Sequence, residues 1–208
     1  MEMVYIVDNP NKNELNKIRS MLGQGKLVVY PTDTIYGIGV DINNIDAVKK
    51  VYMTKKRSYD KPISICLHDI TQVKEVAIVT DEIEHIINEL LPGPYTLLLR
   101  KKSNIPDILT ANTNIIGIRI PDNKITHSLT KDFPITSTSA NLSNIQTPDN
   151  ITDIKKQLGD NIDIYIDCDK KIKNQPSTII DLTQQNPKII RQHKNNELIN
   201  KILKIDLY

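Results

Sequence analysis

Apolar residues along the chain alternate between the spacing of amphipathic helices and that of buried strands. In residues 13–22 the leucine, isoleucine and methionine side chains fall on one face of a helix, and glycines at 23 and 25 end it. The mostly apolar run 26–30 that follows is typical of a buried strand. We therefore predict a helix that leads directly into a strand.

The same alternation continues to the end of the chain. Asn44 is a suitable N-cap for a helix that carries Ala47, Val48 and Val51 on one face. We predict further helices at 81–91, 124–131, 152–158 and 195–203, and strands at 62–67, 95–100, 115–120, 135–137, 162–166, 178–182 and 188–191. The Asn-rich stretch 141–150 is predicted to be a loop within the domain.

This order of elements indicates an α/β fold, with helices flanking a sheet of mixed parallel and antiparallel strands. A chain of 208 residues is long enough to bury one sizeable hydrophobic core. Neither an internal repeat nor a low-complexity tract divides it. We therefore expect one domain over residues 1–208.

Composition narrows the class of protein further. The 27 basic and 25 acidic residues give a net charge of +2, so affinity for nucleic acid must come from a local patch. Cys66 and Cys168 lie too far apart for a CxxC pair, which argues against a zinc site or a disulfide framework. No apolar stretch approaches the roughly 18 residues of a membrane span, and the N-terminus does not resemble a secretion signal. We expect a cytoplasmic protein that does not enter a membrane.

The first candidate for chemistry is the segment 30–39, where a buried strand ends in a proline, two threonines, Asp33 and two glycines. Because α/β proteins bind ligands at strand ends, this segment suits a ligand site. A tight turn in which Asp33 bonds its own backbone is the alternative. Gly37 and Gly39 do not complete a dinucleotide-binding fingerprint.

The second candidate is the segment 49–61, which holds six basic residues and one acid, Asp60. Guanidinium and ammonium groups bind phosphate oxygens, and each charge-assisted hydrogen bond contributes roughly 1.5–3 kcal/mol. A triphosphate therefore suits this segment. The alternative is a solvated helix end, with cations placed favourably at its C-terminal dipole.

The third candidate is the segment 136–143, which carries five hydroxyl groups and one amide after a short apolar strand. Such donors suit phosphate, ribose or carboxylate oxygens, and they also suit turns and caps. Arg119 ends an apolar strand, so it is expected either to form a salt bridge or to bind an anionic ligand. Polar groups at 176–181 and Arg191 lie at the edges of two further strands. The four histidines lack metal-ligand spacing, so we predict no structural metal.

Taken in order, seven short motifs resemble those of the YrdC-like threonylcarbamoyl-adenylate synthase family. The motifs are Pro-Thr-Asp-Thr-Ile-Tyr-Gly at 31–37, Lys-x-Arg at 55–57 followed by Lys61-Pro62, Pro-Gly-Pro-x-Thr at 92–96, Arg-x-Pro at 119–121, Ser-x-Asn at 139–141, Ser-Thr-x-x-Asp at 177–181, and Arg191. Each motif is short, but seven in the same order, spread over most of the chain, are specific.

The resemblance implies a twisted α/β sheet with a concave basic face. It also implies a reaction that makes L-threonylcarbamoyladenylate and pyrophosphate from L-threonine, bicarbonate and ATP, with Mg²⁺ accompanying the ATP. The product would serve the threonylcarbamoyladenosine modification of tRNA, through partner threonylcarbamoyltransferase proteins. The implied residues are Thr34, Arg119, Ser139 and Ser177 for threonine, Arg57, Lys61, Asn141 and Arg191 for ATP, and Lys55 and Arg57 as catalytic cations. Such cations would offset repulsion between carbamate and phosphates and stabilise charge that develops during transfer.

Some positions depart from the family pattern. Cys66 stands where many members carry a histidine, with His68 two residues later, and residues 192–193 replace the usual Pro-Gly. The length resembles the short form of the family. Two alternatives stay open: a non-catalytic protein that binds double-stranded RNA or tRNA on the same face, and a paralogue with another carbamoyl or adenylate transfer reaction.

Overall fold

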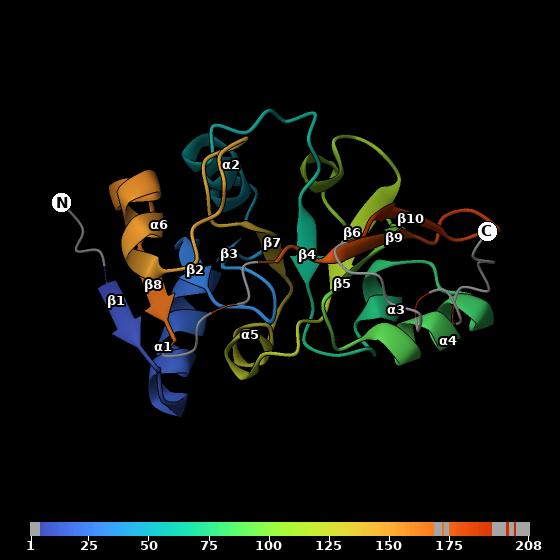
Figure 1. The fold of residues 1–208 in the computed structure, drawn as a ribbon, viewed down its shortest axis with the longest axis horizontal. Helices are drawn as coiled ribbons and strands as arrows, with labels where there is room; N and C mark the ends of the chain where they lie inside the picture. The colour runs from blue at the N-terminus through green and yellow to red at the C-terminus, as the bar shows by residue number, and fades with distance from the viewer. Residues whose placement is uncertain (1–4, 169–171, 173–174, 193–198, 200–201, 203–208) are drawn as a thin grey trace.

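A continuous ten-stranded sheet forms the centre of the computed structural model, in the order β1-β8-β2-β3-β7-β4-β6-β5-β9-β10 (Figure 1). The structure describes residues 5–168, 172, 175–192, 199 and 202. The strands are β1 (Tyr5–Asp8), β2 (Val28–Tyr30), β3 (Gly37–Gly39), β4 (Ser64–Cys66), β5 (Tyr95–Arg100), β6 (Ile115–Arg119), β7 (Ile135–Ser139), β8 (Ile164–Asp167), β9 (Thr178–Asp181) and β10 (Lys188–Arg191). The helices are α1 (Lys12–Gly23), α2 (Ile45–Thr54), α3 (Val73–Val76), α4 (Asp81–Leu90), α5 (Lys124–Leu129) and α6 (Ile151–Leu158), with short 3₁₀ turns η1 (Asp107–Thr110) and η2 (Gly159–Asn161).

The sheet contains both parallel and antiparallel pairs of strands. Strand β8 pairs in parallel with β1 and β2, and the pairs β4–β6 and β5–β9 are also parallel. The pairs β2–β3, β3–β7, β7–β4, β5–β6 and β9–β10 are antiparallel. The predicted α/β class, a mixed sheet with flanking helices, is therefore confirmed.

Local sequence explains where the helices begin and end. Asn44 accepts a hydrogen bond from the backbone N–H of Ala47 at 3.0 Å, so the predicted N-cap of α2 is confirmed. At the start of α1, Asn11 and Glu14 form a reciprocal capping box. Helix α4 stops at Leu90, and the Pro-Gly-Pro segment at 92–94, which cannot continue a helix, follows its C-cap Leu91. No helix within the described ranges is long and apolar enough to cross a membrane.

Most predicted elements are present within a residue or two of their expected bounds. Strand β5 occupies the predicted range 95–100, and the Asn-rich stretch 141–150 is a loop. The short elements β1, β3 and α3 were missed, because three- or four-residue elements carry too little periodicity. The predicted closing helix 195–203 lies mostly outside the described residues.

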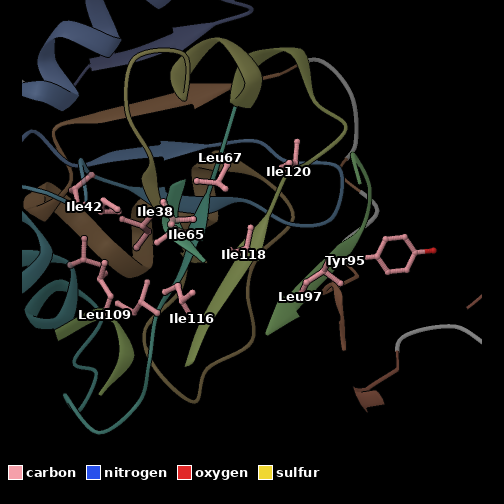
Figure 2. Packing of buried hydrophobic residues seen from close by; sticks show 14 of the residues in the cluster. Ile38, Ile42, Ile65, Leu67, Tyr95, Leu97, Leu109, Ile116, Ile118 and Ile120 are labelled. Atoms are coloured by element: carbon pink, nitrogen blue, oxygen red, sulfur yellow. The ribbon is translucent and has the colours of Figure 1, made fainter. Parts of the chain in front are cut away.

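Two clusters of buried apolar side chains hold the helices onto the sheet. The larger cluster joins α2, α4 and α6 to both halves of the sheet. Figure 2 shows Ile65 of β4 and Ile116 and Ile118 of β6 within it, close to Ile38 of β3. The smaller cluster packs α1 and α5 against the strands β2, β7 and β8. Helices α3 and α4 lie at the opposite end of the molecule from α1 and α6 (Figure 1).

The glycines of the segment 30–39 make room for a buried aromatic ring. Strands β2 and β3 pair so that Tyr30 lies opposite Gly37. A Cβ atom placed on Gly39 would lie 2.9 Å from the Tyr30 ring, and one on Gly37 would lie 3.0 Å from it. The Tyr30 hydroxyl donates to the carbonyl of Thr136 at 3.0 Å, on the neighbouring strand β7. These two glycines therefore serve packing.

Candidate functional site

A pocket of about 660 Å³ opens over the sheet, within the range of small-molecule sites. Most of its lining comes from six strands or their ends, β4, β5, β6, β7, β9 and β10, and from the loop after β7. The lining residues are Ile35, Arg57, Pro62, Ile63, Ser64, Thr96, Leu98, Arg119, Ser137, Thr138, Ser139, Ile145, Gln146, Thr147, Pro176, Ser177, Ile179, Ile190 and Arg191. Three arginines and no carboxylate occur among them, so the lining is electropositive.

The floor of the pocket follows from strand alternation and register. Along β5, Leu97 and Leu99 are buried in the larger cluster, whereas Thr96 and Leu98 line the pocket. Pairing places Ser64 of β4 opposite Ser137 of β7, and both line the pocket. The floor is thus one face of four adjacent strands.

Gly117 of β6 deepens this floor between two polar side chains. It lies opposite Leu98, and a Cβ atom added to it would lie 2.3 Å from the Ser64 hydroxyl oxygen and 3.3 Å from the Thr96 methyl group. Any side chain at this position would displace Ser64 or Thr96. The hollow above β6 therefore depends on glycine.

The first candidate segment, 30–39, lies mostly outside the pocket lining. The segment 30–39 contributes only Ile35 to the lining, because Tyr30 and Thr34 are buried. In the same segment the Thr32 hydroxyl accepts from the backbone N–H groups of Thr34 and Ile35 and so closes a turn. Sequence reasoning identified the strands but not the face on which the pocket opens.

Arg119 forms a salt bridge, one of the two alternatives predicted for it, and also lines the pocket. One terminal nitrogen donates to the Thr34 hydroxyl at 2.7 Å and forms a 3.2 Å salt bridge with Asp33. Its Nε is buried and has no hydrogen-bond partner among the described residues, while the side chain lines the pocket. Burial raises the pKa of the Asp33 carboxyl, and the Arg119 charge opposes this shift. The salt bridge fixes the guanidinium group and leaves a donor unsatisfied.

Arg191 of β10 and Ser177, the residue before β9, also line the pocket. The Nε and one terminal nitrogen of Arg191 donate to the Ser177 carbonyl at 3.0 and 2.8 Å. The Ser177 hydroxyl lies 2.7 Å from that of Thr96 on β5. Burial lowers the pKa of the Arg191 guanidinium, and the nearby charge of Arg119 lowers it further. Two arginines that share a pocket without a carboxylate make it favourable for an anion.

Arg57 lies just beyond the C-terminal end of α2. Its Nε donates to the carbonyl of Lys61 at 3.2 Å, and a terminal nitrogen donates to the carbonyl of Pro62 at 2.8 Å. These bonds position the half-buried guanidinium at the pocket. Burial lowers its pKa.

Lys55 does not line the pocket, although it is two residues before Arg57. Its ammonium group is buried and donates to the carbonyls of Ser139 and Asn141, the latter at 2.7 Å. Its own carbonyl accepts from the backbone N–H of Ser143 at 2.8 Å. Burial lowers the Lys55 pKa to about 7, and the charge of Arg57 adds to this effect. Lys55 thus holds the loop after β7 in place.

The remaining predicted residues are arranged around the pocket rather than in its lining. The Asn141 amide donates to the carbonyls of Leu142 and Ile145 and so orders its own loop. Lys61 is exposed, with its ammonium 3.4 Å from the Asn144 side-chain oxygen.

The pocket brings together five predicted residues: Arg57, Arg119, Ser139, Ser177 and Arg191. It leaves outside its lining four others: Thr34, Lys55, Lys61 and Asn141. The predicted roles of all nine stay predictions. Sequence reasoning missed Ser64 as a lining residue, although a polar residue in an apolar strand was a visible signal. Ser137 lay within the third candidate segment and Thr96 within the 92–96 motif, but neither was assigned to a ligand.

Neither candidate for the usual family histidine lies in the pocket lining. Cys66 is buried within β4, where its sulfur lies 3.4 Å from the Tyr30 hydroxyl oxygen, and burial raises the pKa of the Cys66 thiol. The His68 ring stacks on that of His127, with 3.7 Å between ring centroids.

A metal held by side chains does not fit this pocket. Its lining contains neither carboxylate, histidine nor cysteine. Elsewhere in the described part of the chain, no group of three or more such residues is placed to hold an ion.

The fold and the pocket define an α/β protein with an electropositive pocket on an open face of its sheet. The sequence model of the Sua5/YciO/YrdC family, which carries the description telomere recombination, matches residues 20–193. Because this match spans well over half of the chain, the protein belongs to that family.

Relatives agree with this assignment. The chain is 40% identical to the putative threonylcarbamoyl-AMP synthase of Methanocaldococcus jannaschii, over 83% of this chain and 82% of the relative. It is 31% identical to the threonylcarbamoyl-AMP synthase of Pyrococcus abyssi, over 91% of this chain but only 57% of that protein. The crystal structure of P. abyssi Sua5 complexed with L-threonine superposes with a TM-score of 0.90 at 28% identity, covering 97% of this chain and 61% of that one.

Proposed function

We propose that this protein is a threonylcarbamoyl-AMP synthase, which makes L-threonylcarbamoyladenylate and pyrophosphate from L-threonine, bicarbonate and ATP. The observation that carries the proposal is the pocket with three arginines and no carboxylate, in a chain of this family. Both reactants are anionic, so a site that joins them must offset their repulsion.

Threonine would bind at the wall formed by Arg119, Ser139 and Ser177. A carboxylate placed against Arg119 would satisfy its unpartnered Nε, which the salt bridge with Asp33 holds in place. The hydroxyl groups of Ser139 and Ser177 line the same pocket and suit the amino-acid end of the molecule. The threonine-bound P. abyssi relative supports this choice of substrate.

ATP would lie between Arg57 and Arg191. An oxygen of the threonine carbamate would form a bond to the α-phosphorus, while the bond from that phosphorus to the β-phosphate oxygen breaks and its electron pair leaves with pyrophosphate. No side-chain nucleophile is required, so positioning and electrostatic stabilisation would supply the rate enhancement. Arg57 is the catalytic cation that lines the pocket.

Lys55, Asn141, Thr34 and Lys61 would support this arrangement in different ways. Lys55 and Asn141 order the loop that presents Ser139, and Thr34 orients Arg119. Lys61 is exposed, and its backbone carbonyl accepts a hydrogen bond from Arg57 Nε; its ammonium group would bind the outer phosphates of the nucleotide.

Mg²⁺ would enter with the nucleotide, ligated by phosphate oxygens and water, because the lining offers it no carboxylate. The product adenylate would pass to a tRNA threonylcarbamoyltransferase, a partner protein that attaches the group to an adenosine. We place this activity in the cytoplasm, where tRNA and ATP are available.

The test is pyrophosphate release from ATP and bicarbonate by the purified protein, with and without L-threonine, and with serine and alanine in parallel. Release that depends on threonine is the expected result. Release that is equal with all three amino acids, or absent in a folded protein that still binds ATP, would overturn the threonine assignment and favour a paralogous transfer reaction. Binding of double-stranded RNA without ATP turnover would favour the RNA-binding alternative.

A further inference from the structure

A second hollow, of about 500 Å³, lies between the end of α2 and α6. It is lined by Lys50, Met53, Thr54, Lys56, Leu142, Gln157 and Asn161. We call it the α2–α6 hollow. None of these residues lines the pocket described above, but the loop after β7 contributes to both cavities.

The charge in the α2–α6 hollow has one sign. Lys50 and Lys56 are exposed and form no ion pair with a carboxylate in the described part of the chain. Their neighbour Lys49, outside the hollow, pairs with Asp46 at 3.2 Å. Two ammonium groups without a counter-charge, beside a threonine hydroxyl and two side-chain amides, match the oxygens of a phosphate group.

The backbone at Lys56 gives a second and independent indication. Helix α2 ends in a Schellman motif, in which the N–H of Arg57 bonds the carbonyl of Tyr52 at 2.9 Å and the N–H of Lys56 bonds that of Met53 at 3.0 Å. Lys56 takes the left-handed position of this motif, with φ +48°, where glycine is usual. A residue with a Cβ atom is strained in this conformation, so the presence of lysine points to a use for its side chain.

The motif also explains how three consecutive cations serve three places. Lys55 turns inward to the loop carbonyls, Lys56 reaches the α2–α6 hollow and Arg57 reaches the main pocket. The loop is held from the other side by Gln157 of α6, whose amide accepts from the N–H of Leu142 and donates to the carbonyl of Gln146, both at 3.2 Å. A ligand that contacts Gln157 therefore contacts a support of the pocket wall.

We propose that the α2–α6 hollow binds a phosphate group through Lys50 and Lys56. RNA backbone and free polyphosphate share this chemistry. The exposed Met53, beside the two cations, adds an apolar surface for a sugar or base, which favours RNA as the source. This site is separate from the proposed synthase pocket, so the two proposals stand or fall independently.

The test uses full-length isotope-labelled protein titrated with tripolyphosphate or with a short RNA hairpin. The side-chain amide signals of Gln157 and Asn161 report the α2–α6 hollow, and the backbone signals of Thr96 and Ser177 report the main pocket. We expect both probes to shift the first pair of signals, with tighter binding by RNA. Equal affinity for the two probes would assign the site to free polyphosphate.

Lys56→Gly separates a structural role from binding. Glycine suits the left-handed position, so the midpoint of thermal unfolding should be at least that of the unsubstituted protein, while affinity in the α2–α6 hollow should fall about ten-fold. Lys50→Met should give a similar loss, and Lys49→Met, which removes one charge from the same helix outside the hollow, should change affinity less than about two-fold. Shifts confined to the main pocket, or equal affinities in all three variants, would overturn the proposal.

Discussion

The half of the sheet that contains β2 and β3 differs from the half that contains β4 and β5 in what lies on its faces. In β2 and β3 every residue is buried, and α1 and α5 pack against β2. In β5 and β4, alternate residues turn away from the core and line the pocket, among them Thr96 and Ser64. The first half is a stabilising core, whereas the second half keeps a face free for a ligand.

Glycine shows the difference most clearly. Gly39 in the first half leaves space that the Tyr30 ring fills, whereas Gly117 in the second half leaves space between Ser64 and Thr96 beneath the pocket. The same residue type therefore serves packing in one half and cavity shape in the other.

Among substitutions in the half of the sheet that carries the pocket, Arg119→Ala is expected to have the largest effect. Loss of the charge-assisted hydrogen bonds at this position should raise the threonine KM by about 100-fold, or ~2.7 kcal/mol. It should also lower the free energy of unfolding, because Asp33 loses its ion-pair partner. Steady-state kinetics and urea unfolding measure the two effects.

Tyr165→Phe, on β8 in the half of the sheet without the pocket, is the matched control. It removes a hydroxyl that donates to the carbonyl of Gly159 at 2.7 Å, and should cost about 1 kcal/mol of stability without changing kcat/KM. If both variants lost activity equally per folded molecule, the distinction between the halves would fail.

Arg57→Ala should act on the nucleotide alone. Removal of its guanidinium should raise the KM for ATP by roughly 30-fold, from ~2 kcal/mol of lost charge-assisted bonding, and leave threonine binding within about two-fold. Isothermal titration with each substrate separates these effects. A loss of threonine affinity as large as the loss of ATP affinity would contradict the assignment of Arg57 to ATP and Arg119 to threonine.

The two glycines offer the sharpest contrast of stability with activity. Gly39→Ala forces a Cβ against Tyr30 and Ile135 and should destabilise the protein by about 1–3 kcal/mol, with activity retained in the folded fraction. Gly117→Ala displaces the Ser64 hydroxyl or Thr96 and should lower kcat/KM at least about ten-fold. The comparison of the halves is wrong if the two substitutions have interchangeable effects.

A smaller effect concerns pH and Lys55. Its pKa falls from 10.5 to about 7 on burial, so between these values the unfolded chain binds a proton that the folded chain does not. The free energy of unfolding should therefore rise with pH in this window, by up to ~1.4 kcal/mol per pH unit, and level off below about pH 7.

Lys55→Met should lack this component. Urea titrations at pH 7, 8 and 9 give the free energy of unfolding of the unsubstituted protein and of Lys55→Met. The change with pH in the difference between these two free energies is the contribution of Lys55. A difference that stays constant with pH would show that Lys55 keeps its proton throughout.

The sequence predicted the long elements well and the arrangement of the site only in part. Helix periodicity and the Asn44 cap located α2, and the Tyr95–Arg100 strand was identified in full. Strand pairing is a long-range property that periodicity does not encode, so the position of the pocket could not be derived. The floor residues Ser64 and Ser137 are opposite one another only because β4 pairs with β7.

The predicted lining residues came from the order of short motifs rather than from local pattern. Arg119 was predicted to be either paired or ligand-binding, and it proved to be paired through one nitrogen with Nε unsatisfied. The burial of Lys55, by contrast, could not be predicted from the sequence. A basic residue in a cation-rich segment gave no sign in the sequence that its ammonium group is buried against loop carbonyls.

The order of strands has a consequence for synthesis on the ribosome. Strand β5 is flanked by β6 and β9, and β9 and β10 come last in the chain. Until residue 181 has emerged, the edge of β5 that pairs with β9 is unpaired, and until residue 191 has emerged the pocket lacks Arg191. A nascent chain therefore has no complete pocket before β10 has been translated.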